Sequence, residues 1–410
     1  MTSETIYDLA VIGGGAAGLL CAVTAAERGK SVALIEPNER LGWKLRLTGK
    51  GRCNLTNDCD VKTVLAHIPG GGRFLYGALS RFTPADAMAW FESRGLALKT
   101  ERGNRVFPVS DNANDVAELL ISLCRRNGVT RLRTRAVGIA LEEGAVCGVK
   151  TEQGLVRCAA AAVCTGGLSY PRTGSTGDGY RLARSMGHRV TPTRPSLVPL
   201  VSPDPWCAEL QGFTLKNVKL RAYEDDKLVY SEQGELLFTH FGVSGPLVLS
   251  ASAHMPRMGE AAYRLEIDLK PALDEQTLDK RLLRDFEKYA AREFKNALGD
   301  LAGRSMIPVL VRLSGIPEDT RVSEITREQR RSLLRLLKAF PVSISGTRPI
   351  DEAIVTAGGV DLKEIDPRSM QSKLIPGLYF AGEVLDLDAY TGGFNLQIAW
   401  STGHLVGDSV

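Results

Sequence analysis

The stretch Gly13-Gly14-Gly15-Ala16-Ala17-Gly18 decides the fold of this chain, because it fits the pattern G-x-G-x-x-G. The mostly apolar residues 6–12 before it predict a short buried strand. Gly13 permits a tight turn, Gly15 lets the backbone approach a pyrophosphate, and Gly18 lets a helix lie close to the sheet. We therefore predict a dinucleotide-binding βαβ unit, with Ala16 and Ala17 in the first helical turn, whose free N–H groups face the phosphates.

The residues after the glycine turn support this interpretation. Gly29 is placed to end the helix, residues 31–35 form a second apolar strand, and Glu36 closes that strand. A carboxylate at this point can accept hydrogen bonds from both ribose hydroxyls of an adenosine. The carboxylate disfavours a 2′-phosphate at this position, and therefore NADP, so NAD and FAD remain as the candidate cofactors. The alternative, a glycine-rich turn that binds nothing, leaves Glu36 unexplained.

A second group of glycines near the C-terminus favours FAD. Residues 377–383 read as a strand that runs into the turn Gly382-Glu383, and Gly392-Gly393-Phe394-Asn395 then opens an amphipathic segment. Flavoproteins of the glutathione-reductase type close their cofactor site with such an element, and the helix N-terminus faces the flavin ring. The turn Thr165-Gly166-Gly167 and the strand around Val137 resemble two further parts of the same class, the second of which contacts adenine.

Composition and length fit a globular protein of two or three domains. The 410 residues are 44% hydrophobic and 24% charged, with a formal net charge of +4. The eight cysteines are scattered without a CxxC pair, which indicates reduced thiols rather than disulfides. With no signal peptide and no apolar run of membrane-spanning length, we expect a cytoplasmic protein without membrane contact. No Cys/His spacing supports a metal site.

The motifs divide the chain into three parts. Residues 1–190 and 345–410 together form one discontinuous α/β domain of the Rossmann-like, glutathione-reductase type. Residues 191–270 open on a proline-punctuated crossing and continue in short β-like runs, which indicate a β-barrel-like insert. Residues 271–344 carry leucines at helical spacing and are expected to form a small helical insert.

With these motifs in place, the chain resembles the BaiN/RdsA (YhiN-like) family of flavoproteins over nearly its whole length. The main carriers are the run Gly51-Arg52-Cys53-Asn54-Leu55-Thr56-Asn57, the turn at 165–171 and the stretch 237–246. The resemblance implies an FAD oxidoreductase that uses NAD(P)H as a transient reductant, and a cofactor site that includes Lys44, Arg52 and Asn54. Family members reduce a uridine of large-subunit ribosomal RNA to dihydrouridine or act on bile-acid intermediates. The run 390–398 departs from the ribosomal members.

Two side chains are candidate proton donors for the reduction of a conjugated C=C bond. Cys53 lies near Lys50 and Arg52, whose charges would lower its pKa; alternatively it packs beneath the flavin. His240 lies in a loop between β-like runs, where it could also be structural. A disulfide reductase using Cys53 and Cys59 is a further alternative, but its usual cysteine spacing and second dinucleotide motif are missing.

The partner is either ribosomal RNA or a small-molecule substrate. Arg327, Arg331 and Arg335 share one face of an expected helix, and such a stripe could bind phosphates or simply face solvent. The open function classes are an RNA-modifying flavoenzyme, a small-molecule ene-reductase and an FAD-dependent sensor.

Overall fold

The computed structural model describes residues 5–410 and separates into two compact units. Unit 1 comprises the chain up to Ser196 and from Ile350 onward, and unit 2 comprises residues 197–349. The boundaries thus lie a few residues from the expected 190/191 and 344/345. The crossing at 191–195 belongs to unit 1, because β10 (Arg194–Ser196) pairs with β18 (Val355–Ala357) in that unit.

A seven-stranded sheet forms the centre of unit 1. Its strand order is β6-β2-β1-β9-β8-β7, and β19 also pairs with β9. The central pairs β1–β2 and β1–β9 are parallel, and their near-continuous apolar runs are buried, as expected for strands covered on both faces. The strands are β1 (Tyr7–Ile12), β2 (Val32–Ile35), β6 (Thr130–Leu132), β7 (Ala136–Glu142), β8 (Ala145–Thr151), β9 (Gly154–Val163) and β19 (Leu378–Phe380).

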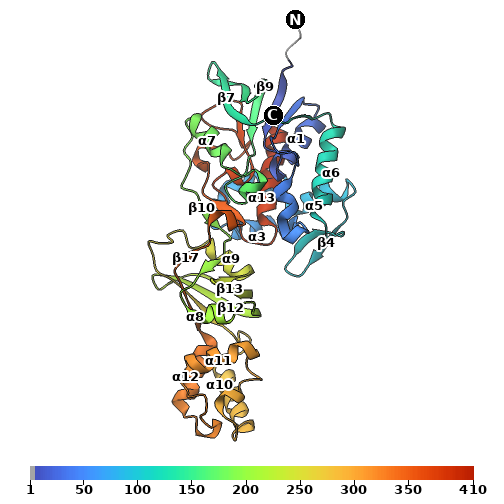
Figure 1. The fold of residues 1–410 in the computed structure, drawn as a ribbon. Helices are drawn as coiled ribbons and strands as arrows, with labels where there is room; N and C mark the ends of the chain where they lie inside the picture. Colours follow the sequence, from blue (N-terminus) through green and yellow to red (C-terminus); the bar gives the residue numbers. More distant parts are fainter. Residues whose placement is uncertain (1–4) are drawn as a thin grey trace. The chain divides into compact units, whose positions relative to one another are not determined.

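Two helices from opposite ends of the chain cross closely over this sheet (Figure 1). A Cβ added at Gly403 would lie 2.4 Å from the Ala17 carbonyl oxygen, and one at Gly407 would lie 2.6 Å from that of Cys21. These glycines let α13 (Phe394–Ser409) pack directly on α1 (Ala16–Glu27). The C-terminal helix is therefore fixed to the helix that follows the glycine turn.

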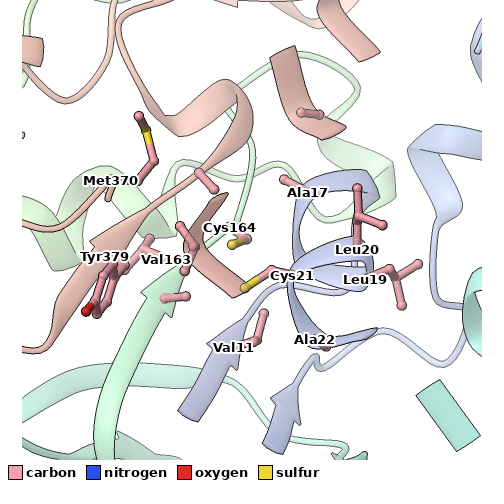
Figure 2. Close-up of a cluster of buried hydrophobic side chains, with 14 of the residues drawn as sticks. Val11, Ala17, Leu19, Leu20, Cys21, Ala22, Val163, Cys164, Met370 and Tyr379 are labelled. Atoms are coloured by element: carbon pink, nitrogen blue, oxygen red, sulfur yellow. The ribbon is translucent and has the colours of Figure 1, made fainter. Parts of the chain in front are cut away.

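A core of buried hydrophobic side chains packs around the first residues of α1 (Figure 2). Leu19, Leu20 and Ala22 of α1 are fully buried there, and the sulfur atoms of Cys21 and Cys164 face each other. All eight cysteines are free thiols, as the sequence predicts for the scattered pattern.

The remaining elements of unit 1 surround the sheet. A small sheet of order β3-β5-β4 follows the first βαβ unit. Its strands are β3 (Thr56–Asn57), β4 (Leu98–Glu101) and β5 (Arg105–Pro108). The helices are α2 (Trp43–Leu47), α3 (Val61–Ala66), α4 (Tyr76–Arg81), α5 (Pro84–Glu92), α6 (Ala113–Arg126) and α7 (Asp178–Ser185).

Unit 2 combines an antiparallel sheet with five α-helices. The strand order is β16-β15-β12-β13-β14-β11-β17. The strands are β11 (Leu200–Val201), β12 (Thr214–Glu224), β13 (Lys227–Thr239), β14 (Gly242–Ser244), β15 (Tyr263–Asp268), β16 (Phe340–Ile344) and β17 (Gly346–Thr347). The helices are α8 (Pro205–Glu209), α9 (Pro246–Ser252), α10 (Glu275–Lys288), α11 (Ile307–Ser314) and α12 (Arg327–Lys338).

One part of the expected helical insert is a strand. Residues 340–344 fall within 271–344, yet they form β16 and pair with β15 from Tyr263↔Ile344 to Ile267↔Phe340. Phe340 and Val342 are buried while Pro341 and Ser343 are exposed, so the side chains alternate with the period of a strand.

Across residues 5–410, no helix combines the length and the apolarity that crossing a membrane requires.

Candidate active site

A cleft in unit 1 gathers most of the predicted cofactor residues. It holds about 1070 Å³ of empty space, its open mouth included. The N-termini of α1 and α13 both reach it, so the helical N–H groups of both first turns contribute to the same cleft. The predicted residues that line it are Gly13, Gly15, Ala16, Ala17, Glu36, Lys44, Thr165, Gly166, Gly382, Glu383 and Asn395.

The glycine turn has the geometry that pyrophosphate binding requires. Gly13 has φ +108°, and a Cβ there would lie 2.6 Å from the Cys164 carbonyl oxygen. A Cβ at Gly18 would lie 1.9 Å from the Gly13 carbonyl oxygen, so only glycine lets α1 start so close to the turn. At Gly15, by contrast, no atom lies within 4 Å of an added Cβ. This open space lies in the cleft, directly before the first residue of α1.

Glu36 holds the turn and still faces the cleft. Its carboxylate accepts hydrogen bonds from the backbone N–H of Gly14 (2.8 Å) and of Asn38 (2.9 Å). A carboxylate offers about four acceptor sites, so two of them remain for ribose hydroxyls. The position of Glu36 at the end of β2 therefore suits the adenosine end of a dinucleotide.

An ion pair between distant segments also lines the cleft. Lys44 Nζ lies 2.6 Å from Glu383 Oε2 and donates to Ser169 Oγ at 2.7 Å. Glu383 Oε1 accepts from Ser169 Oγ (3.0 Å) and from the backbone N–H of Thr356 (3.0 Å). The charged atoms are thus satisfied in a half-buried network at the cleft.

The segment Asn54–Asn57 braces the N-terminus of α13. Asn57 Nδ2 donates to the Gly392 carbonyl (3.1 Å), and Asn54, with its amide turned so that both ends are satisfied, accepts from Gly393 N–H (3.0 Å). Thr56 Oγ1 donates to Gln397 Oε1 (2.6 Å) deeper in the helix. Asn54, Gly393 and Phe394 therefore lie behind the cleft wall and support it, outside the set of lining residues.

Four other predicted cofactor residues also lie outside the lining. Gly18 and Gly167 are packed against neighbouring atoms, Gly167 with an added Cβ 2.5 Å from Thr356 Oγ1. Val137 is 42% exposed on β7, and its carbonyl accepts from Arg181. The fourth is the guanidinium of Arg52, which is bound elsewhere, to Asp111 (2.8 Å) and Glu101 (2.5 Å).

The prediction that nearby cations lower the pKa of Cys53 is wrong. The Cys53 side chain is fully buried, and burial raises the pKa of its thiol to about 12. Arg52 faces Glu101 and Asp111, so its charge is neutralised by them. Cys53 does not line the cleft, and Cys59 is likewise a free thiol whose pKa burial raises to about 11.

His240 lies in unit 2, on the turn between β13 and β14. Its side chain is exposed, and its ring meets that of Phe241 edge to face at 5.0 Å. The described residues 5–410 contain no cluster of three or more His, Cys, Asp or Glu that could hold a metal ion.

Sequence reasoning missed several lining residues. It also missed two residues outside the lining that bind Glu383, namely Ser169 of the turn at 165–171 and Thr356 of β18. Trp43, the first residue of α2, also lines the cleft, and its position directly before Lys44 is the sequence signal that points to it. The other missed lining residues include Asn38, Arg40, Thr48, Ser175, Ile354, Val355, Leu387 and Leu396.

The cleft fits FAD on three structural observations. The space at Gly15 can receive a pyrophosphate, and the buried Thr165 hydroxyl lacks a hydrogen-bond partner among the described residues. The N-termini of α1 and α13 both reach the cleft, which favours negative charge. Bound FAD would be held by the glycine turn and Glu36 at one end, and by Glu383, Lys44 and the start of α13 at the other.

Residues 7–409 match the family described as HI0933-like protein Rossmann domain. The chain belongs to this family. Over 97% of this chain and 96% of the relative, it is 33% identical to the Ribosomal RNA dihydrouridine synthase of Escherichia coli (strain K12). It is 32% identical to the 3-dehydro-bile acid delta(4,6)-reductase of Clostridium scindens, over 97% of this chain and 98% of the relative.

Solved structures show the same fold for this member of the HI0933-like family. The 3-ketosteroid delta1-dehydrogenase of Sterolibacterium denitrificans has a TM-score of 0.52 at 13% identity, with 98% of this chain and 99% of that chain covered. An open-conformation flavocytochrome c3 fumarate reductase has a TM-score of 0.50 at 15% identity, covering 99% of this chain and 78% of that chain. The predicted α/β Rossmann-type, FAD-binding fold and the predicted oxidoreductase are thus confirmed.

Proposed function

We propose that this HI0933-like protein uses NAD(P)H and FAD to reduce one uridine of large-subunit ribosomal RNA to dihydrouridine. One observation carries the proposal: a cleft suited to FAD lies in a chain that is 33% identical over almost its whole length to a ribosomal RNA dihydrouridine synthase. FAD would supply the ring that takes up and delivers the hydride.

The residues of the cleft have defined tasks in this proposal. Glu36 and the glycine turn bind the adenosine and pyrophosphate, and the Lys44–Glu383 pair orients the cofactor. The N-terminus of α13 favours negative charge where it develops on reduction. Cys53 does not line the cleft, so our candidate donor of the proton to the second carbon is the exposed His240.

The RNA partner would need a cationic surface, and α12 offers one. Arg327, Arg331 and Arg335 are exposed and have no ion pair with any described residue. The neighbouring basic residues are ion-paired instead: Arg330 binds Asp279, and Lys338 binds Asp268. We define the exposed three as the α12 arginine face and propose that it contacts RNA phosphates.

Mass spectrometry of large-subunit ribosomal RNA from a deletion strain tests the function. The proposal predicts the loss of a two-dalton increment, two added hydrogens, from one uridine, and its return when the gene is restored. Unchanged RNA would contradict it. The 32% identity to a bile-acid reductase then favours a small unsaturated ketone, which flavin reoxidation by enones would reveal.

A further inference from the structure

The cleft exposes a tryptophan that the proposed chemistry does not use. Trp43 begins α2, lines the cleft and is 38% exposed. Leu47, one helical turn further on, is 47% exposed, so the two side chains share a face of α2. A large indole left partly in water at a ligand cleft forgoes the hydrophobic stabilisation that burial would give it.

The other three tryptophans of the chain are differently placed. Trp400 is fully buried and donates its indole N–H to the Leu55 carbonyl at 2.9 Å. The Trp90 ring lies beneath the guanidinium of Arg94, 4.1 Å from its centroid. Trp206 donates its indole N–H to the Pro341 carbonyl at 3.1 Å. Trp43 is thus the tryptophan whose ring lies at the cleft.

The position of Trp43 is fixed from both sides. Gly42 before it donates its backbone N–H to the Gly14 carbonyl at 2.8 Å, which ties the start of α2 to the glycine turn. Lys44 after it is bound to Glu383 and Ser169. The indole is therefore presented from a short helix that is anchored at both neighbouring residues, which lowers the entropic cost of stacking a ligand on it.

The charges beside Trp43 indicate which ring it receives. Lys44 and Arg40 also line the cleft, and Arg40 is exposed, with its guanidinium 3.1 Å from Asn114 Oδ1. Lys44 is already paired with Glu383, so the exposed guanidinium of Arg40 is the cation that we assign to a ligand. An aromatic face next to such a cation suits a flat heteroaromatic ring that carries phosphate. We propose that Trp43, with Leu47 beside it, is a stacking platform for the ring of a nucleotide that enters the cleft next to the resident cofactor.

Two molecules that take part in the proposed function carry such a ring. The stacking platform rests on the proposed function only for the identity of these two ligands. One is NAD(P)H, and the other is the RNA strand on either side of the reduced uridine. Both would place a base or a nicotinamide on the indole and a phosphate near Arg40.

The test uses the FAD-loaded full chain with Trp43→Ala and Trp43→Phe, and Tyr76→Ala as the control. Tyr76 is an aromatic residue of unit 1 that is 62% exposed and does not line the cleft. Binding is measured for NADH, NADPH, reduced nicotinamide mononucleotide and an oligonucleotide of ribosomal RNA sequence. Quenching of indole fluorescence gives a direct second readout for stacking.

We expect Trp43→Ala to weaken nucleotide binding by roughly 5- to 100-fold, the range of a lost base-stacking contact. Trp43→Phe should restore most of it, and Tyr76→Ala should change nothing. An effect confined to the dinucleotides assigns the platform to the reductant, one confined to the oligonucleotide assigns it to the substrate strand, and an effect on both means that they bind there in turn.

Two results would overturn the platform. One is unchanged binding of every nucleotide by Trp43→Ala. The other is loss of FAD from Trp43→Ala, because the ring on the indole would then be that of the resident cofactor. The binding measurements need no turnover, so a wild-type enzyme that binds nucleotides through Trp43 but reduces no uridine would end the proposed function and leave the platform standing.

Discussion

The backbone of Gly393 touches that of Thr56: a Cβ added to Gly393 would lie 2.3 Å from the Thr56 carbonyl oxygen. Gly393 also has φ +100°, a conformation that residues with a side chain rarely adopt. The contact joins the segment Asn54–Asn57 to the first turn of α13, at the end of the cleft where we place the flavin ring.

Gly393→Ala should therefore displace the start of α13. The backbone strain alone costs about 1–3 kcal/mol, and the clash with Thr56 adds to it. We expect a lower free energy of unfolding in urea and loss of bound FAD, read from the visible absorbance of the purified protein. Gly70→Ala is the matched control, since nothing lies within 4 Å of its added Cβ. Full retention of FAD by Gly393→Ala would contradict this role of the contact.

The Lys44–Glu383 pair gives a second prediction. Lys44→Met leaves the half-buried Glu383 carboxylate without its cation, and the lost charged hydrogen bonds cost about 1.5–3 kcal/mol each. FAD binding should weaken, as measured by titration of apoprotein. The double variant Lys44→Met/Glu383→Gln should lose less than the sum of the two single variants, because the second change removes the unpaired charge. Strict additivity would show that the two groups do not act together.

The parts of the fold that follow from local pattern could be predicted. The strands expected at 6–12 and 31–35 are β1 and β2, and the run opening at Gly392 leads into α13. Five of the residues expected at the glycine turn and at its acidic partner line the cleft because the βαβ geometry places them together: Gly13, Gly15, Ala16, Ala17 and Glu36.

Partners far apart in the chain could not be predicted. Arg52 is adjacent to Cys53 in sequence, yet it binds Glu101 and Asp111, which lie 49 and 59 residues further on. For the same reason, the sequence did not predict the contact of Thr356 with Glu383 or the pairing of β16 with β15. In each case the deciding contact depends on tertiary packing that local spacing does not encode.

Burial of Cys53 predicts a pH effect on stability rather than on turnover. Its pKa is raised from an ordinary value of 9.0 to about 12, so the folded protein keeps the proton that the unfolded chain loses above pH 9. This contribution to stability is complete below pH 9 and is lost as pH rises towards 12. At pH 7 the free energy of unfolding of Cys53→Ala should be about 1–2 kcal/mol lower than that of the wild type. Urea titrations at pH 10 should show a smaller difference between the two proteins.

Turnover gives the complementary test of both thiols. Cys53→Ala and Cys59→Ser should each retain substrate reduction once loaded with FAD, because neither thiol is placed as a donor in the cleft. A dead Cys59→Ser enzyme would revive the disulfide-reductase alternative.

His240 remains our predicted proton donor. His240→Asn should slow substrate reduction by roughly 100-fold, the lower range for loss of a general acid, while FAD content and flavin reduction by NAD(P)H stay unchanged. The side chain is exposed, so folding should not suffer. Lys216→Gln, an exposed change in the same unit, is the control. If substrate reoxidises the reduced flavin of His240→Asn at the normal rate, His240 is a surface residue without a role in proton transfer.

The α12 arginine face makes the last prediction, which concerns salt. Each phosphate neutralised by an arginine contributes about 0.7–0.9 to the slope of log affinity against log salt concentration. Arg331→Glu/Arg335→Glu should therefore make that slope shallower by roughly 1.4–1.8 and weaken binding of a ribosomal RNA fragment. Reduction of a small enone should be unaffected, because a substrate without phosphates needs no contact with the α12 arginine face. Arg125→Glu/Arg126→Glu makes the same change of charge at exposed positions on α6. If both double variants lower the slope equally, RNA is attracted by overall charge, and the α12 arginine face is only a solvated surface.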